Sequence, residues 1–126
     1  MIHLDTNVLI GLVAARATFY ESVEQWLAQG EILAVSALVW SEFLSGPVSD
    51  QQIALVEQIV GSRVVPFDSG EAVVAAGLFN RAGRRRGSRV DGFVAATALR
   101  AGAALATTNR NDFQIFVQFG LRLLEV

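Results

Sequence analysis

The segment Ile2-His3-Leu4-Asp5-Thr6-Asn7-Val8-Leu9-Ile10 indicates how this chain folds. Its first residues form a short, mostly apolar run that ends at an acid, which predicts a strand near Ile2–Leu4. A helical spacing of apolar residues follows and predicts a helix from about Asn7 to Ala14. A strand followed at once by a helix is the first half of a βαβ unit, the building block of a parallel sheet.

The same alternation continues along the rest of the chain. We expect further strands near Ile32–Val35, Arg63–Pro66, Ala104–Thr107 and Leu121–Glu125. We expect helices at Thr18–Gln29, Ser36–Leu44, Ser49–Val60, Ser69–Arg81 and Asp91–Arg100, and a short helical turn after Asn109. Ser36 and Ser49 are suitable helix N-caps. The pattern predicts an α/β protein with a parallel sheet.

Composition restricts the class of protein. A chain of 126 residues with 52% apolar residues predicts one well-packed domain. It has no cysteine, which excludes disulfides, thiolate zinc sites and a cysteine nucleophile. No apolar run approaches the roughly 20 residues that cross a bilayer. The first residues lack a basic segment and soon meet an acid, so we expect no signal peptide and a cytoplasmic protein.

The charges are unevenly distributed. All ten basic residues are arginine, and five of them fall between Arg81 and Arg89, a stretch without an acid. The remainder of the chain then carries five arginines against all twelve acids. A basic strip on an acidic body predicts a contact with nucleic acid, with Arg84, Arg85, Arg86 and Arg89 as candidate RNA-binding residues. A solvated helix end that aids solubility explains the strip equally well.

Four acids are expected at one edge of the predicted sheet. Asp5 follows the first strand, Glu42 lies early in the helix after the second, Asp91 opens a helix, and Asp112 follows the fourth strand. Strands of a parallel sheet end at one edge, and the helices that follow them begin there. We therefore expect these four carboxylates to converge although they are far apart in the sequence.

Each acid has a simpler explanation when considered alone. Asp5 and Asp91 could be helix N-caps, Glu42 a solvated helix residue, and Asp112 part of an Asx turn. His3 lies within the first strand, and a packed residue is a better interpretation than a metal ligand. Only the convergence of the acids favours a function, because clustered carboxylates repel unless a cation is present.

Metal-assisted hydrolysis of a phosphodiester suits such a cluster. Oxygen ligands favour Mg²⁺ or Mn²⁺ over zinc, and such ions polarise phosphate and activate water. The chain offers no Cys–His pair, and its only histidine has no evident serine partner, so covalent catalysis of that kind is not expected. The absence of lysine also excludes a P-loop nucleotide binder.

Four blocks of the sequence resemble the PIN-domain family, and within it the toxins of VapBC toxin–antitoxin pairs. The blocks are Ile2–Ile10, Val35–Gly46, Arg89–Ala98 and Leu105–Phe113. Each block is weakly specific alone, but all four occur in the family's order and span nearly the whole chain. The resemblance implies a single domain over residues 1–126, a three-layer α/β/α sandwich around a five-stranded parallel sheet.

The resemblance also implies an activity and a site. It implies a Mg²⁺- or Mn²⁺-dependent endoribonuclease in which Asp5 and Asp91 are the principal metal ligands and Glu42 completes the site. Asp112 is assigned to the fourth acidic position, although family members can have an acid where this chain has Asn109. Thr6 and Asn109 are expected in supporting roles, Thr6 by orienting Asp5 or a bound water through its hydroxyl.

The partners implied by the resemblance are an RNA substrate, a second copy of the chain and a cognate antitoxin. The antitoxin's C-terminal segment is expected to cover the active-site groove. We expect the helices between Asn7 and Gln29 to contribute an apolar wall to that groove through Leu9, Leu12, Val13, Phe19 and Tyr20, with core packing as the alternative for these residues. A PIN nuclease outside a toxin pair and a non-catalytic PIN-like binding module remain the alternative functions.

Overall fold

A single parallel sheet lies at the centre of the computed structural model, which describes residues 1–84 and 89–126. Its strands are β1 (Ile2–Leu4), β2 (Leu33–Ser36), β3 (Val64–Val65), β4 (Ala104–Ala106) and β5 (Leu123–Leu124). They lie in the order β3-β2-β1-β4-β5, and each neighbouring pair is parallel. The carboxyl ends of the strands therefore share one edge, as predicted.

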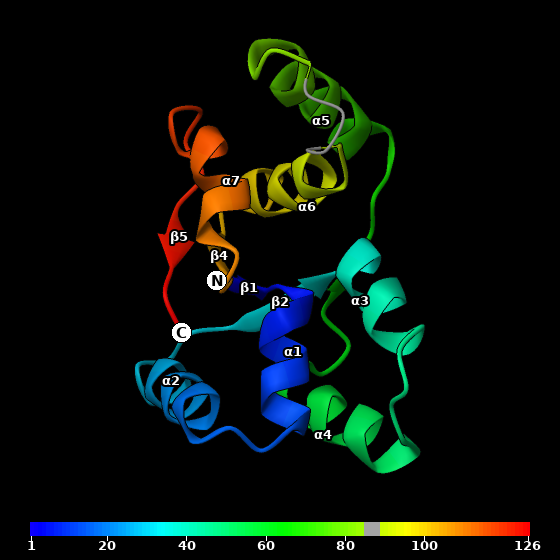
Figure 1. Ribbon diagram of the computed structural model, residues 1–126, viewed down its shortest axis with the longest axis vertical. Coiled ribbons are helices and arrows are strands. Elements are labelled where there is room, and N and C mark those ends of the chain that lie inside the picture. Colours follow the sequence, from blue (N-terminus) through cyan, green and yellow to red (C-terminus); the bar gives the residue numbers. More distant parts are fainter. Residues whose placement is uncertain (85–88) are drawn as a thin grey trace.

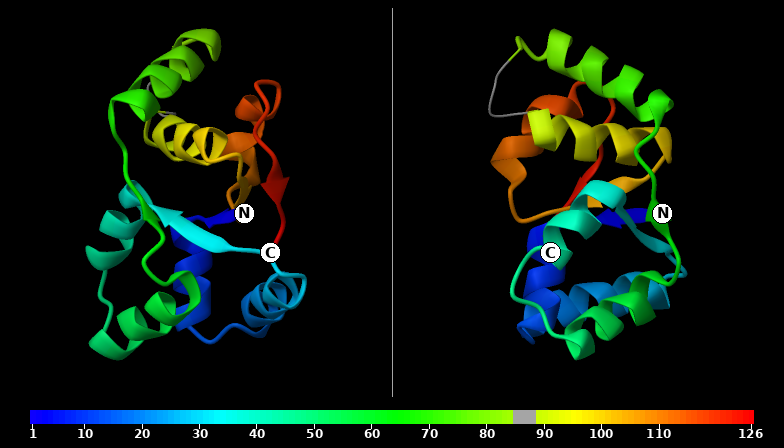
Figure 2. Two further views of the ribbon diagram at one scale, coloured as in Figure 1. Left: turned by 180° about the vertical axis from the view of Figure 1, so that it is seen from behind. Right: turned by 90° about the vertical axis from the view of Figure 1, so that its right-hand side faces the viewer.

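Helices cover both faces of this sheet. They are α1 (Thr6–Val13), α2 (Ala17–Ala28), α3 (Ala37–Leu44), α4 (Asp50–Val60), α5 (Ser69–Arg81), α6 (Arg89–Arg100) and α7 (Arg110–Val117). Helices α1, α2 and α4 lie on one side of the sheet, and α6 and α7 lie on the other (Figures 1 and 2). Helix α5 packs on α6, and α3 extends from the carboxyl end of β2. The predicted α/β/α sandwich is confirmed.

Local sequence signals explain where several helices begin. Ser36 Oγ accepts a hydrogen bond from the Val39 backbone N–H at 3.1 Å, so Ser36 caps α3 as predicted. Ser49 and Gln52 form a reciprocal capping box at the start of α4. Because these caps satisfy backbone donors that the helix leaves unpaired, α3 and α4 begin within one residue of the expected positions.

Two predicted boundaries were wrong. Helix α6 begins at Arg89, so Asp91 lies inside its first turn and does not cap it. A carboxylate there still interacts favourably with the helix dipole. The segment after Asn109 forms a helix of eight residues and not a short turn. Phe113 and Phe116 are both buried on that helix, and their packing stabilises a helix whose polar sequence alone suggested only a turn.

The core is formed where β1, the central strand, contacts its neighbours and the covering helices. Leu4, Leu33 and Leu105, from three adjacent strands, are fully buried. Leu9, Leu12 and Phe19 also belong to this core. They therefore do not line a partner groove, and the alternative of simple core packing holds for them. No helix in the described part of the chain is long and apolar enough to span a membrane.

An ion-pair cluster fixes the start of α5 to the end of α6. Arg100 Nη1 lies 2.9 Å from Glu71 Oε2 and 3.2 Å from Asp68 Oδ1. Glu71 is buried, so its charge would be costly without this partner. The Arg100 guanidinium lies directly over Gly70, in the space where any other residue would place its Cβ. The glycine therefore permits the close approach of the two helices.

His3 is a buried, unpaired residue of the central strand. Its side chain is 1% exposed, and neither ring nitrogen has a hydrogen-bond partner among the described residues. Burial, and to a smaller extent the positive N-terminus, lowers the pKa of His3 to about 4. The ring is therefore neutral in the folded protein at neutral pH, and its burial confirms the interpretation of His3 as a packed residue.

We predict that His3 makes the fold sensitive to acid. The unfolded chain takes up a proton near the ordinary histidine pKa and the folded chain only near 4, so stability falls as pH decreases between these values. The loss amounts to about 2 kcal/mol by about pH 5. His3→Leu should remove most of this pH dependence in urea unfolding measured at about pH 7.5 and about pH 5. An identical pH dependence in parent and variant would contradict the prediction.

Candidate active site

A cavity of about 160 Å³ lies at the carboxyl edge of the sheet. Its lining consists of Asp5, Thr6, Asn7, Ile10, Glu42, Val90, Asp91, Val94 and Asn109. Asp5 follows β1, Glu42 lies on α3 after β2, and Asp91 lies in the first turn of α6. The structure thus brings together at this cavity three of the four acids that were predicted to converge.

Asp5 is held in one orientation by hydrogen bonds to both carboxylate oxygens. Oδ1 accepts from the Thr6 backbone N–H at 2.9 Å, which makes Asp5 the N-cap of α1. Oδ2 accepts from Thr107 Oγ1 at 2.7 Å and from Asn7 Nδ2 at 3.1 Å. The residue is only 7% exposed, so these donors compensate a buried charge. Asp5 is therefore both the N-cap of α1 and a residue of the candidate site.

Asn7 and Thr107 also connect α1 to the loop after β4. Asn7 Oδ1 accepts from the Thr108 backbone N–H at 3.0 Å. Thr107 Oγ1 accepts from the Asn109 backbone N–H at 3.0 Å and donates to Asp5. Sequence analysis did not identify either residue as part of the site. The available signal was their position, since each follows a buried strand closely at the carboxyl edge.

The electrostatics of Asp91 show that the acids influence one another. Burial, followed by the charges of Asp112, Asp5 and Glu42, raises the pKa of Asp91 to about 6. The three other acids act in the same direction because each disfavours a further negative charge nearby. The cavity edge is therefore a region of negative potential, as expected of a cation site.

Asp112 and Asn109 occupy different positions. Asn109 lines the cavity with the three acids. Asp112, in the first turn of α7, lines a neighbouring polar hollow of about 250 Å³ that also contains Asn109. Asp112 is nevertheless the first of the charges that raise the pKa of Asp91. It therefore contributes to the field of the site without lining the cavity itself.

The donor chemistry of the cavity fits a hard divalent cation. Carboxylate, hydroxyl and amide oxygens line it, and Thr6 Oγ1 is buried without a hydrogen-bond partner among the described residues. Within residues 1–84 and 89–126, no three acidic or histidine side chains are close enough to ligate one ion together. Mg²⁺ commonly uses one or two carboxylates and completes its shell with water and substrate phosphate, so an open arrangement suits it.

The candidate RNA-binding arginines lie apart from this cavity. Arg84 and Arg89 line a second, larger pocket between α5 and α6. Arg85 and Arg86 lie outside the described residues. Their assignment as RNA-binding residues remains a prediction.

The chain belongs to the PIN domain family, whose model matches residues 2–116. PIN domains are generally nucleases, which are hydrolases. Among curated protein sequences, none matches this chain significantly.

Solved structures share the fold over nearly the full length. The chain is 21% identical to a chain of VapBC2 from Rickettsia felis bound to promoter DNA, with a TM-score of 0.75 and coverage of 100% of this chain and 99% of that one. FitAcB from Neisseria gonorrhoeae is 26% identical to it with a TM-score of 0.66, and the match covers 98% of this chain and 96% of that one. VapBC-1 from nontypeable Haemophilus influenzae is 24% identical with a TM-score of 0.69, and the match covers 99% of this chain and 98% of that one. The chain therefore resembles chains of toxin–antitoxin complexes.

We predict that Asp91→Asn stabilises the metal-free protein at neutral pH. The pKa of Asp91 is higher in the folded chain than in the unfolded chain. Ionisation of Asp91 therefore destabilises the folded state, and this loss of stability develops as pH rises from about 4 to about 6. Solvent screens this partly exposed residue, so we expect a gain on the order of 1 kcal/mol, or a few degrees in Tm. Thermal unfolding in EDTA at about pH 7.5 and about pH 4 measures it, and the gain should disappear at the lower pH.

Asp50→Asn is the matched control for this measurement. Asp50 also lies in the first turn of a helix, so both substitutions remove a favourable interaction with a helix dipole. Only Asp91 faces other acids of the cavity. Equal changes in Tm for the two variants at neutral pH would contradict mutual repulsion at the site.

Proposed function

We propose that this chain is a Mg²⁺- or Mn²⁺-dependent endoribonuclease and the toxin of a toxin–antitoxin pair. The observation that carries the proposal is the convergence of Asp5, Glu42 and Asp91 on one cavity. Membership of a generally nucleolytic family and likeness to chains of VapBC and FitAB complexes support it. The proposed substrate of the enzyme is RNA.

The residues of the cavity would have different roles in such a site. Asp5 and Asp91 would hold the ion, Glu42 would contact it through a bound water, and Asp112 would add negative potential. The bound ion would polarise the phosphate and lower the pKa of an attacking water. Asn7 and Thr107 hold the Asp5 carboxylate in place. Thr6, whose hydroxyl lacks a partner among the described residues, can accept or donate a hydrogen bond to water in the cavity. Asn109, which also lines the cavity, can donate to a substrate phosphate oxygen.

A neighbouring hollow supports inhibition by an antitoxin segment. This hollow of about 190 Å³ lies between α1 and the α3–α4 region. It is lined by Ile10, Val13, Ala14, Glu42, Phe43, Gly46, Pro47, Val48 and Gln52. Ile10 and Glu42 line the acid cavity too. A peptide whose apolar side chains fill this hollow would therefore extend to the acids and exclude substrate. Of the five residues that were expected to form an apolar wall of the antitoxin groove, Val13 lines this hollow.

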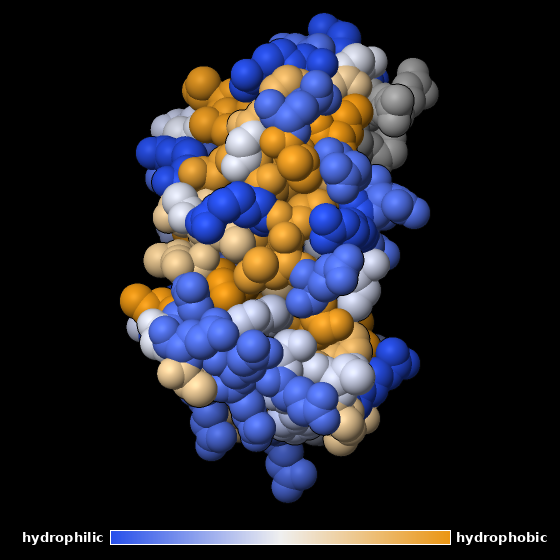
Figure 3. Space-filling view, turned by 90° about the vertical axis from the view of Figure 1, so that its left-hand side faces the viewer, coloured by the Kyte–Doolittle hydropathy of each residue, from blue (hydrophilic) through white to orange (hydrophobic). Residues whose placement is uncertain are grey.

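The surface also supports a homodimer. Apolar side chains gather on the half of the molecule built from α5 to α7, whereas hydrophilic ones cover the half around α2 (Figure 3). Val73 on α5 is 74% exposed and Val117 on α7 is 38% exposed. Exposed apolar patches commonly mark protein interfaces, so we place the second copy on this half of the molecule.

Asp5→Asn tests the proposed activity directly. Asparagine keeps the shape of the side chain and its capping oxygen, so we expect an unchanged Tm within a few degrees. We expect cleavage of single-stranded RNA with Mg²⁺ or Mn²⁺ to fall at least about 100-fold. EDTA should abolish cleavage by the parent. In a bacterial host, the parent should arrest growth and the variant should not. Equal cleavage by parent and variant would overturn the assigned site.

Thr107→Val tests the support of Asp5. The substitution keeps the shape of Thr107 but removes the hydroxyl that donates to Asp5 Oδ2. Loss of such outer hydrogen bonds typically costs about 10- to 100-fold in metal affinity or activity, so we expect a higher Mg²⁺ requirement and slower cleavage. Thr108→Val is the control, because the described contact of Thr108 uses its backbone N–H. Parent-like metal dependence in Thr107→Val would contradict this role.

A further inference from the structure

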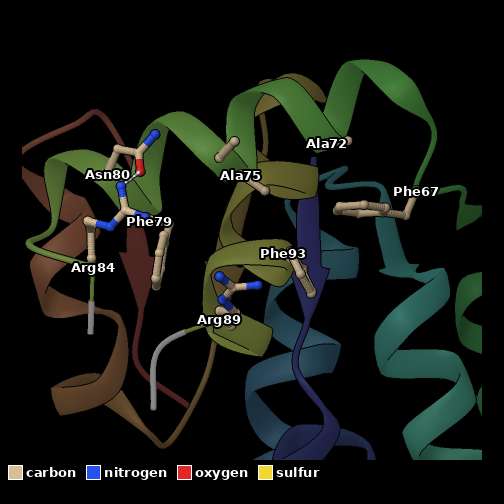
Figure 4. Close-up of a pocket in the computed structure, with 9 residues that line it drawn as sticks. Phe67, Ala72, Ala75, Phe79, Asn80, Arg84, Arg89 and Phe93 are labelled. Carbon is tan, nitrogen blue, oxygen red and sulfur yellow. Dashed lines mark hydrogen bonds between the residues drawn. The ribbon is translucent and has the colours of Figure 1, made fainter. Parts of the chain in front are cut away.

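A pocket of about 420 Å³ opens between α5 and α6, outside the acid cavity. Its lining consists of Phe67, Ala72, Ala75, Ala76, Phe79, Asn80, Arg84, Arg89 and Phe93. Figure 4 shows side chains of both helices pointing into it. Its volume falls within the roughly 300–1,000 Å³ of pockets that hold small ligands. The pocket is thus large enough for one planar ring system.

Both ends of this pocket carry flat, electron-rich or cationic groups. At one end Phe67 and Phe93 meet edge to face, with ring centroids 5.1 Å apart. At the other end the Arg89 guanidinium carbon lies 4.5 Å from the centroid of the Phe79 ring, and that of Arg84 lies 5.7 Å from it. Stacking on Phe79 holds a guanidinium plane in place, which leaves its other face available for a second flat group.

The polar groups of the pocket are suited to an anion attached to a flat ring. Arg84 and Arg89 are its charged residues, and neither forms an ion pair with an acid of the described chain. Asn80 Oδ1 accepts from Arg84 Nη1 at 3.3 Å, so the Asn80 amide N–H groups remain available to a ligand. Aromatic faces, guanidinium planes and an amide are the groups with which proteins bind unpaired RNA bases.

The first turns of α6 contribute to both this pocket and the acid cavity. Arg89 and Phe93, one helical turn apart, line the pocket. Val90, Asp91 and Val94 line the acid cavity. Successive residues of a helix differ by about 100°, so Arg89 and Phe93 lie on a side of α6 nearly opposite to Asp91, and a helix with its side chains is about 10–12 Å across. An RNA strand that crosses the N-terminal end of α6 would therefore reach from Asp91 to Arg89 within a few nucleotides.

We propose that the α5–α6 pocket binds one unpaired base of the RNA substrate, close to the phosphate that is cleaved. The base lies against Arg89 and Phe93, its edge reaches Asn80, and the guanidinium edges of Arg84 and Arg89 contact the flanking phosphates. The proposal rests on the proposed ribonuclease function and assigns to it a recognition site that the acids do not provide. The partly buried ion pair of Glu71 with Arg100 keeps α5 against α6 and so preserves the pocket.

Ala76→Trp is the direct test, because Ala76 is an exposed residue of α5 that lines the pocket. A tryptophan there fills the pocket without changing charge. Ser69→Trp is the matched control, since Ser69 is exposed on the same helix and does not line the pocket. Arg89→Gln is a second variant, and Arg16→Gln controls for the loss of one exposed positive charge.

Binding is measured in EDTA by fluorescence anisotropy with labelled oligoribonucleotides of about eight residues. The probes are oligo(A), oligo(C), oligo(U) and an abasic ribose-phosphate chain. We expect the parent and Ser69→Trp to bind at least one base-bearing probe about tenfold or more tightly than the abasic probe. In Ala76→Trp that preference should disappear, and Arg89→Gln should weaken it more than Arg16→Gln does.

Either of two results of the binding assay would overturn the proposal. One is equal affinity of the parent for base-bearing and abasic probes, and the other is an unchanged preference in both Ala76→Trp and Arg89→Gln. If Ala76→Trp instead changes the oligomeric state in sedimentation and leaves base preference unchanged, the pocket holds a second copy, which also overturns the proposal. Metal-dependent cleavage by the parent is assayed in parallel. Intact cleavage with a failed binding test refutes the pocket alone, whereas absent cleavage refutes the ribonuclease function.

Discussion

Repulsion among carboxylates at one edge of a parallel sheet is the constraint around which this molecule is arranged. The sheet gathers Asp5, Glu42 and Asp91 because its strands end together, and burial together with the neighbouring negative charges raises the pKa of Asp91. Asp5, the most buried of them, is stabilised by three donors, and the other acids remain in contact with solvent. The fold thus maintains an unfavourable concentration of charge that a cation would relieve.

The hydrogen bonds that stabilise Asp5 also join distant parts of the chain. Thr107 is 102 residues from Asp5 in sequence, and Asn7 contacts both Asp5 and the loop after β4. Pairing of β1 with β4 is the structural reason, since it places the ends of these strands side by side. Geometry at the site consequently depends on the centre of the sheet, whereas recognition of substrate and partners is assigned to surfaces on the surrounding helices.

Much of the fold was predictable because the signals were local and strong. Apolar runs predicted all five strands, and Ser36 and Ser49 marked two helix starts. Convergence of the acids followed from parallel topology alone. Side-chain contacts across the chain could not be predicted, so Asn7 and Thr107 were missed and the different positions of Asn109 and Asp112 were unresolved. The α5–α6 pocket likewise depends on helix packing, which periodicity does not specify. Helix α7 was underestimated because tertiary burial of Phe113 and Phe116 stabilises it.

The order of the strands has a consequence during synthesis of the protein. The central strand β1 emerges from the ribosome first, yet its partner β4 and the Thr107 hydroxyl emerge only after four-fifths of the chain has been made. At roughly 5–20 residues per second, Asp5 remains without this support for several seconds. A nascent chain therefore lacks an assembled site while it is still attached to the translating ribosome and its messenger RNA. Strand order alone delays maturation of the site until β4 and Thr107 have been made.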